Sequence, residues 1–121
     1  VFFFFLHPAA VFGKDLMIDH GTGIVIGETA VLGDNISLLH GVTLGGSGKE
    51  AGDRHPKISD GVMIGANASV LGNIRINQCA KIGAGSVVVE DVPAFTTVVG
   101  VPAREVGKTG SIPAQEMDQR L

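Results

Sequence analysis

Apolar residues recur at every sixth position along most of the chain. One series of this period runs from Leu6 to Val42, and a second runs from Ile58 to Ala94. A helix would show apolar residues three and four positions apart, and a longer strand would show simple alternation. Six-residue units with one inward aliphatic and frequent Gly, Asn or Asp instead indicate short strands joined by tight corners, three strands to a turn. The pattern therefore predicts an all-β fold, a parallel β-helix of triangular section with about five coils of about 18 residues each.

The two series are separated by the segment GGSGKEAGDRHPKI, which runs from Gly45 to Ile58. The step from Val42 to Ile58 is not a multiple of six, since it exceeds one unit of the repeat by ten further residues. We interpret it as the one interruption of the period, an extended loop that leaves the β-helix at about residues 45–56. Insertions in repeat proteins form loops on one face, often the binding face. Candidate chemistry is therefore expected in this loop.

Composition and charge exclude several classes of protein. The 121 residues are enough for one domain, and a net charge of −3 without a basic stripe gives nucleic-acid binding no electrostatic support. There is no run of about 18 apolar residues that would predict a membrane span. The single cysteine, Cys79, cannot form an internal disulfide and has no CxxC partner for structural zinc. These features favour a cytosolic protein and predict no metal site.

Six motifs resemble the C-terminal catalytic domain of bacterial serine acetyltransferases, a family of hexapeptide-repeat acyltransferases. They are LHPAA (Leu6–Ala10), IDHGTGIVIGET (Ile18–Thr29), VTLGGSGKEAGDRHPKI (Val42–Ile58), GVMIGANASVLGNI (Gly61–Ile74), KIGAGSVV (Lys81–Val88) and GVPAREVG (Gly100–Gly107). The hexads alone indicate only the superfamily, whereas DHGTG, GGSGK and DRHPKI are more specific. The resemblance implies a left-handed β-helix that transfers acetyl from acetyl-CoA to the hydroxyl of L-serine. It also implies that the product, O-acetyl-L-serine, serves cysteine biosynthesis in the cytoplasm.

Such a reaction requires a base whose pKa lies near neutral pH, and histidine is the natural candidate. His20 stands between Asp19 and the small residues Gly21–Gly23, where a substrate can approach closely. The resemblance places the general base on His20 and assigns Asp19 to the ammonium group of serine. It also assigns Arg54 and His55 to the serine carboxylate, for which the planar guanidinium of arginine is well suited.

The glycine-rich part of the loop is not a P-loop, because Thr43 and Glu50 stand where that motif requires glycine and serine or threonine. In the family this segment flanks the pantetheine arm of CoA, and its backbone amides are suited to stabilise an oxyanion. The resemblance predicts contacts with acetyl-CoA, the co-substrate, at Gly45, Gly46, Ser47, Ala66, Lys81 and Ala84. A zinc hydratase of the carbonic-anhydrase kind shares this prism but needs closely spaced histidines, and here even the closest pair, His7 and His20, is more than two hexads apart.

One position departs from the family pattern. The family orients its catalytic histidine with an aspartate two residues before HPAA, and Phe5 occupies that position. A phenyl ring can neither fix the imidazole tautomer nor stabilise the imidazolium. Two alternatives therefore stay open: a non-catalytic or weakened assembly domain, and an acetyltransferase for another hydroxylated acceptor. The DRHPKI segment favours an amino-acid acceptor over a sugar.

The resemblance also predicts a domain organisation. Residues 1–5 are interpreted as the remnant of a missing N-terminal helical domain, 6–107 as the β-helix and 108–121 as a truncated C-terminal tail. In the family, the helical domain joins two trimers into a hexamer, and the tail docks O-acetylserine sulfhydrylase. We expect a homotrimer, because outward-facing apolar residues would leave a monomer with too much exposed apolar surface. These residues are Val25, Val31, Leu38 and Leu71.

Overall fold

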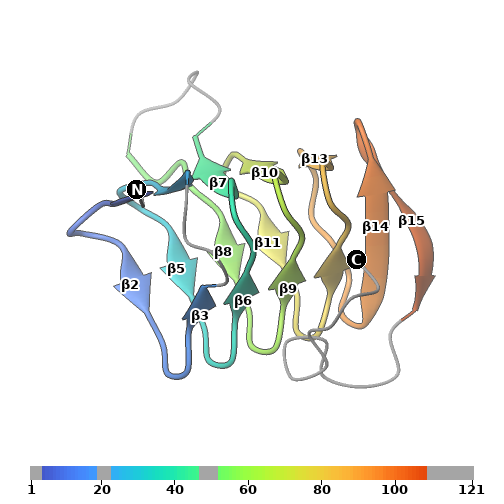
Figure 1. Ribbon diagram of the computed structural model, residues 1–121, viewed down its shortest axis with the longest axis horizontal. Helices are drawn as coiled ribbons and strands as arrows, with labels where there is room; N and C mark the ends of the chain where they lie inside the picture. Colours follow the sequence, from blue (N-terminus) through green and yellow to red (C-terminus); the bar gives the residue numbers. More distant parts are fainter. Residues whose placement is uncertain (1–3, 19–22, 47–51, 109–121) are drawn as a thin grey trace.

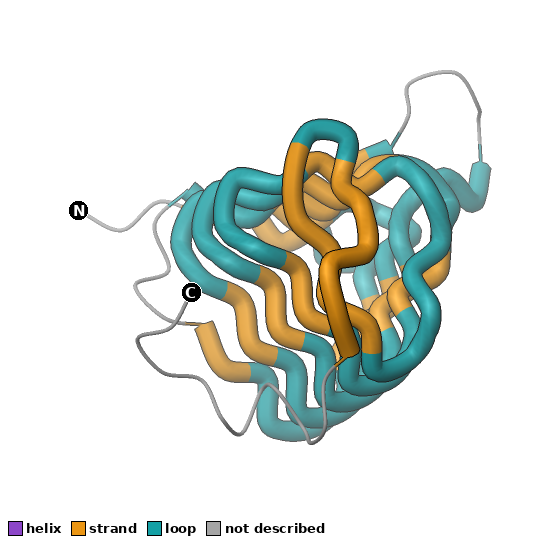
Figure 2. The backbone as a smooth tube through the Cα atoms, turned by 90° about the vertical axis from the view of Figure 1, so that its right-hand side faces the viewer, coloured by secondary structure: helices purple, strands orange, loops and turns teal. Residues whose placement is uncertain are grey.

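The computed structural model describes residues 4–18, 23–46 and 52–108. Over these residues the chain forms a column of stacked coils built from strands and turns, without a helix (Figure 1). This part of the chain accordingly offers no helix that could cross a membrane. Viewed along the column, the coils outline a three-sided prism (Figure 2). One of its sheets has five strands, one from each coil, so the predicted all-β fold of about five coils is confirmed.

Three sheets form the three faces of the prism. The first face contains β1 (Phe4–Leu6), β4 (Ile24–Ile26), β7 (Thr43–Gly45), β10 (Ser69–Leu71) and β13 (Val87–Val88). The second face contains β2 (Val11–Phe12), β5 (Val31–Leu32), β8 (Lys57–Ile58) and β11 (Arg75–Ile76). The third face contains β3 (Met17–Ile18), β6 (Ser37–Leu38), β9 (Met63–Ile64), β12 (Lys81–Ile82), β14 (Thr96–Gly100) and β15 (Ala103–Lys108).

Neighbouring strands within a face are parallel, because the chain completes one coil before it returns to the same face. Val25 of β4 pairs with Thr43 of β7, and Ser69 of β10 pairs with Val87 of β13, in both cases one regular coil later along the chain. The last pair differs, since β14 and β15 are antiparallel and form a hairpin at one end of the column (Figure 1).

In the inner coils, a six-residue unit turns two side chains inward rather than one. On β4 the first and last side chains are fully buried, while Val25 between them is half-buried, because successive side chains of a strand point to opposite sides. Leu38 of β6 occupies the second inward position, where it pairs with Ile18 and Ile64 of the adjacent coils and is fully buried. The expectation that Leu38 faces outward was therefore wrong.

The loop adds fewer residues to its coil than the apolar series suggested. Val31 pairs with Lys57, so this coil exceeds the regular coil from Val25 to Thr43 by eight residues instead of the expected ten. The count of ten was wrong because Val42 and Ile58, between which it was made, occupy different inward positions of the six-residue unit. Ile58, the start of the second series, pairs with Leu32 and so continues the second inward position.

The period is also interrupted at two further places. Ile18 pairs with Leu38 rather than with Ile36, so the coil that begins at β3 is two residues longer than a regular one. At the other end of the column, Lys81 pairs with Thr97 rather than with Val99, so the coil that begins at β12 is two residues shorter. The interpretation of a single interruption was therefore wrong.

Polar side chains close the corner between the second and third faces. The Oδ1 atom of Asp34 accepts a hydrogen bond from the backbone N–H of Lys14 (2.7 Å), and Asp60 Oδ1 accepts one from the N–H of Asp34 (2.7 Å). A Cβ atom on Gly13 would lie 2.3 Å from the Asp34 carboxylate, so this ladder requires glycine there. Asn35 has a φ of 57°, in the left-handed region that asparagine tolerates.

The strand boundaries define the loop and the extent of the β-helix. β7 ends at Gly45 and β8 begins at Lys57, which confirms an extended loop at about residues 45–56. Phe4 and Phe5 belong to β1, which pairs with β4, and β15 continues to Lys108. The strands thus extend on both sides of the predicted range 6–107.

Candidate active site

The loop between β7 and β8 returns to the prism at a corner between the first and second faces. Because β8 pairs with β5, the last residues of the loop lie beside the turn that joins β4 to β5. The backbone N–H of Val31 donates to the carbonyl oxygen of Pro56 (3.1 Å), which fixes this contact. We call Gly27, Thr29, Arg54 and His55 the Thr29–His55 corner.

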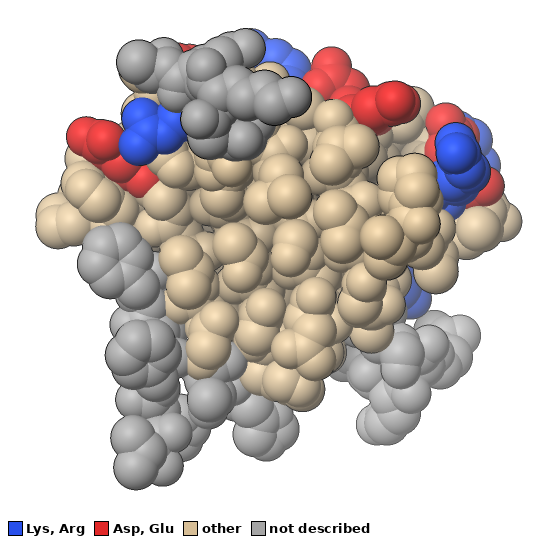
Figure 3. Space-filling model, turned by 90° about the horizontal axis from the view of Figure 1, so that it is seen from above, with Lys and Arg blue, Asp and Glu red and all other residues tan. Residues whose placement is uncertain are grey.

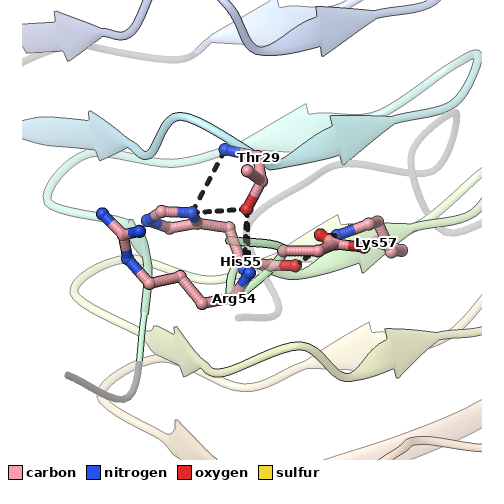
Figure 4. A network of polar contacts seen from close by, with 5 residues as sticks. Thr29, Arg54, His55 and Lys57 are labelled. Carbon is pink, nitrogen blue, oxygen red and sulfur yellow. Dashed lines mark hydrogen bonds and ion pairs between the residues drawn. The ribbon is translucent and has the colours of Figure 1, made fainter. Parts of the chain in front are cut away.

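Thr29 is the centre of the hydrogen bonding at this corner (Figure 4). Its Oγ1 atom accepts hydrogen bonds from the backbone N–H groups of Arg54 (3.1 Å) and His55 (3.0 Å). The same oxygen lies 2.7 Å from Nδ1 of the His55 ring. The backbone N–H of Thr29 also donates to Nδ1, at 3.1 Å. One threonine therefore holds both the backbone and the imidazole ring of the returning loop.

His55 lies in a setting that favours its neutral form. Only 6% of the residue is exposed. Burial is the main cause that lowers the pKa of the His55 imidazole below its ordinary value of 6.5, and the positive charges of Arg54 and Lys57 lower it further. The negative charge of Glu28 acts in the opposite direction. The ring is therefore an uncharged hydrogen-bonding group at neutral pH.

Two glycines provide surfaces for the paired side chains of Arg54 and His55. A Cβ atom on Gly27 would lie 2.1 Å from Cδ2 and 2.2 Å from Nε2 of His55, so the imidazole rests directly on the Gly27 backbone. A Cβ atom on Gly46 would lie 3.1 Å from Cγ and Cδ of Arg54. Figure 4 shows the guanidinium and the edge of the ring that faces away from Thr29 on the same side. The arrangement places the guanidinium and the outer nitrogen of the imidazole together.

Lys57 is engaged within the loop itself. Its Nζ atom lies 2.5 Å from Oδ1 of Asp53 and donates to the carbonyl oxygen of His55 at 2.7 Å. The hydrogen bond from Lys57 is the largest cause that lowers the pKa of the exposed Asp53 carboxyl. Lys57 thereby ties the two ends of the segment Asp53–Lys57 together and leaves Arg54 as its outward cation.

The predicted cofactor residues lie at two different corners. Gly45 ends β7, and Gly46 contacts Arg54 at the Thr29–His55 corner. Ala66 and Ala84 instead lie on adjacent coils where the third face meets the first, because the N–H of Gly85 donates to the carbonyl oxygen of Ala66 (2.8 Å).

The remaining predicted site residues are distributed as follows. Lys81 belongs to β12 on the third face, between Met63 and Thr97. Asp19, His20 and Ser47 lie outside the described residues. Within the part of the chain that is described, no group of three or more His, Cys, Asp or Glu side chains could hold a metal ion.

Sequence reasoning assigned no role to Thr29, Gly27 or Lys57. Thr29 lies 26 positions before His55 in the chain. The paired residues Val31 of β5 and Lys57 of β8 are separated by the same number of positions. A correct count of the residues added by the loop would have brought Thr29 and His55 together. The missing signal was therefore the register between coils.

Comparisons with known proteins bear on the repeats, the fold and the family of the chain. A family model for the bacterial transferase hexapeptide (six repeats) matches residues 55–90. The curated serine acetyltransferase of Salmonella typhimurium is 63% identical over 117 residues, which cover 96% of this chain and 43% of that protein. The chain thus spans less than half the length of this relative.

Two solved structures are also similar. A serine acetyltransferase from Brucella abortus in complex with coenzyme A has a TM-score of 0.85 and 64% identity, over 86% of this chain and 42% of that one. A soybean serine acetyltransferase complexed with serine has a TM-score of 0.82 and 65% identity, over 84% of this chain and 42% of that one. The fold is therefore the left-handed parallel β-helix of hexapeptide repeats. By its repeats, its fold and these matches, the chain belongs to the serine acetyltransferase family of hexapeptide-repeat transferases.

Proposed function

We propose that the chain is a serine O-acetyltransferase, which transfers acetyl from acetyl-CoA to the L-serine hydroxyl and yields O-acetyl-L-serine and CoA. The observation that carries the proposal is the pairing of Arg54 and His55, held side by side by Thr29 where the loop rejoins the prism. The Brucella abortus and soybean relatives, whose complexes contain coenzyme A and serine, support these two ligands.

The proposed acceptor site recognises an amino-acid carboxylate. Arg54 is half-buried against Gly46 and presents a planar guanidinium, which can pair with both oxygens of a carboxylate. His55 adds a neutral N–H donor beside it. In the proposed complex, Asp19 receives the serine ammonium group, so that both charged ends of the substrate are paired.

The proposed chemistry proceeds in one ternary complex. His20 takes the proton of the serine hydroxyl while the hydroxyl oxygen attacks the thioester carbonyl carbon. Backbone amides near Gly45 and Gly46 stabilise the oxyanion of the tetrahedral intermediate, and the small side chains of Ala66 and Ala84 let the cofactor lie against the prism. The C–S bond of the tetrahedral intermediate then breaks, and the CoA thiolate that leaves receives the proton from the His20 imidazolium.

This proposed site requires more than one chain. The segment 19–22 connects β3 on the third face to β4 on the first, whereas Arg54 and His55 lie where the first face meets the second. The first face separates these two corners within one chain. In a ring of three chains whose first faces surround the axis, the corner between the third and first faces of each chain would lie beside the Thr29–His55 corner of its neighbour.

The character of the first face supports a homotrimer. Its strands contain no charged residue, and its outward side chains on the described coils are only half-buried: Val25, Thr43, Ser69, Leu71 and Val87. Figure 3 shows a broad uncharged surface with acidic and basic side chains at its rim. We propose that this face packs between chains in a trimer.

Three further expectations stay predictions: the binding of O-acetylserine sulfhydrylase by the tail, a cytoplasmic location and a role in cysteine biosynthesis.

The activity is tested by following thiol release from acetyl-CoA with and without L-serine. Release that depends on serine supports the proposal, and His20→Ala should reduce turnover by about 10²–10⁴-fold with CoA binding retained. An active His20→Ala variant, or an isolated acetyl-enzyme, would contradict the mechanism.

The Phe5→Asp variant tests the alternative of a weakened domain, since activity that appears only in this variant would support that alternative. Light scattering tests the assembly, and a stable active monomer would refute it.

A further inference from the structure

The hydroxyl of Thr29 has all of its hydrogen-bonding capacity in use. A threonine hydroxyl offers one O–H donor and two acceptor positions. Backbone N–H groups can only donate, so the bonds from Arg54 and His55 occupy both acceptor positions of Oγ1. Nδ1 of His55, 2.7 Å from Oγ1, therefore cannot donate to this oxygen, and the hydroxyl proton can point to Nδ1 or to the exposed Asp53 carboxylate, which also interacts with the Thr29 side chain.

Thr29 fixes the state of the His55 ring. Nδ1 accepts the backbone N–H of Thr29 (3.1 Å), which can only donate, and it also lies within reach of the hydroxyl proton, 2.7 Å from Oγ1. An Nδ1 atom that accepts a hydrogen bond carries no proton of its own. In a neutral imidazole the proton then resides on Nε2, on the opposite edge of the ring.

We propose that Thr29 is a positioning residue of the acceptor site, which holds His55 as the neutral Nε2–H tautomer so that Nε2 donates beside the Arg54 guanidinium. The inference rests on the proposed function, because it takes the serine carboxylate as the ligand of both donors. It adds to that function a residue that need not contact the substrate.

The local charges explain why a neutral donor is suited to this place. Arg54 and Lys57 lie on the same loop as His55, Glu28 lies on the adjacent turn, and His7 faces the site from the adjacent coil. Lys57 is paired with Asp53. With His55 neutral, Arg54 supplies one positive charge for one carboxylate. A protonated His55 would lose both hydrogen bonds from Thr29 and would place a second cation beside Arg54.

Gly27 completes the restraint on the ring. The imidazole is held at its Nδ1 edge by Thr29 and rests on the Gly27 backbone near Nε2. Among the described residues, all hydrogen bonds of the ring run through Nδ1. The donor edge is therefore oriented by the protein before a ligand arrives, which reduces the cost of ordering it on binding.

The first measurement is ¹⁵N NMR of the His55 side chain in the 121-residue chain, titrated with acid. We expect the Nε2–H tautomer and a protonation midpoint below the ordinary histidine value. Thr29→Val removes the hydroxyl and should raise the midpoint and weaken the tautomer preference, whereas Thr29→Ser should restore both. Thr97→Val, the same change on β14, is the matched control. A purely structural role for Thr29 would leave the tautomer unchanged in any variant that folds.

The second measurement is the KM for serine. Loss of one hydrogen bond to His55 should raise it about 3- to 10-fold in Thr29→Val, with the KM for acetyl-CoA little changed and with recovery in Thr29→Ser. Should Thr29→Val fail to fold, the wild-type spectrum decides, since an Nδ1–H tautomer or an ordinary midpoint overturns the inference. Equal midpoints in Thr29→Val and wild type overturn it as well. A wild-type chain with the expected tautomer but no serine-dependent thiol release would refute the proposed function and its acceptor site, and would retain only the control of the His55 tautomer by Thr29.

Discussion

The wall of the prism around Ile64 and the Thr29–His55 corner are held in different ways. Ile64 is fully buried between Leu38 of the preceding coil and Ile82 of the following coil. All three side chains are aliphatic. At the corner, one threonine hydroxyl and one backbone N–H hold a ring and two backbone groups of a loop. The wall is thus specified repeatedly, whereas the corner depends on a single residue.

This difference separates stability from recognition. Each coil of a solenoid contacts mainly its neighbours, so the energy of the wall is a sum of similar increments. A buried hydrogen-bonded group at the corner adds little net energy but is costly to leave unpaired. We therefore expect substitutions in the wall to change unfolding, and substitutions at the corner to change the binding of one substrate.

The largest effect is expected in the wall. Ile64→Ala should lower the free energy of unfolding by about 2–5 kcal/mol, because it removes buried methylene groups and leaves a cavity between two coils. Val31→Ala on the exposed side of β5, where 37% of the residue is exposed, is the control and should change it by less than about 0.5 kcal/mol. Urea denaturation of both variants measures the difference. Similar losses would show that the inward column is not the main source of stability.

A large but selective effect is expected for Arg54. Arg54→Ala should raise the KM for serine about 30-fold or more, since a bound carboxylate loses its charged partner, and should change the KM for acetyl-CoA little. Arg54→Lys should recover only part of the loss, because a lysine ammonium lacks the planar fork. Steady-state kinetics with each substrate varied in turn provides the test. Equal changes for both substrates would mean that the loop as a whole had been displaced.

A smaller effect is expected from crowding the imidazole. Gly27→Ala places a methyl group 2.1 Å from the His55 ring, so the ring must move, and the KM for serine should rise about tenfold. Gly107→Ala is the matched control, because a Cβ atom there meets nothing within 4 Å. Unchanged serine kinetics in Gly27→Ala, with Gly107→Ala also unchanged, would show that the position of the ring does not matter for binding.

The smallest effect concerns pH. Because the pKa of His55 is lowered on folding, the unfolded chain takes up a proton first as the pH falls through the ordinary value of 6.5. The contribution of the neutral His55 ring to the free energy of unfolding is therefore complete above that pH and is lost as the pH falls below it. Unfolding measured at about pH 7.5 and about pH 5.5 should show a smaller loss in His55→Gln than in wild type, and parallel losses would contradict the assigned state. The other histidines are present in both proteins, so their contributions cancel in this comparison.

The wall was largely predictable from the sequence, and the corner was not. The recurrence of aliphatics such as Ile36, Val42 and Ile64 at a period of six predicts three-sided coils, because no helix or flat sheet buries that pattern. The number of inward positions in each six-residue unit was not predicted, because side chains alternate along a strand and Ile36 and Leu38 therefore both face inward. A period of six cannot distinguish these two inward positions.

The corner residues fall into two groups. Arg54 and His55 were predicted as a pair because they are adjacent in sequence and match a specific motif. Thr29 was missed because its contact with His55 depends on how many residues the loop adds, and sequence counting gave ten where the register gives eight. Contacts across coils require that register, which only the paired strands reveal.

The most direct test of the acceptor site compares L-serine with ethanolamine, which keeps the hydroxyl and the ammonium group but lacks the carboxylate. In acetyl-CoA thiol release by the wild-type chain, kcat/KM should be at least about a hundredfold higher for serine, because ethanolamine leaves Arg54 and His55 without a partner. The same ratio should collapse in Arg54→Ala. Comparable values for the two acceptors in the wild-type chain would contradict the assignment of this corner to an amino-acid carboxylate.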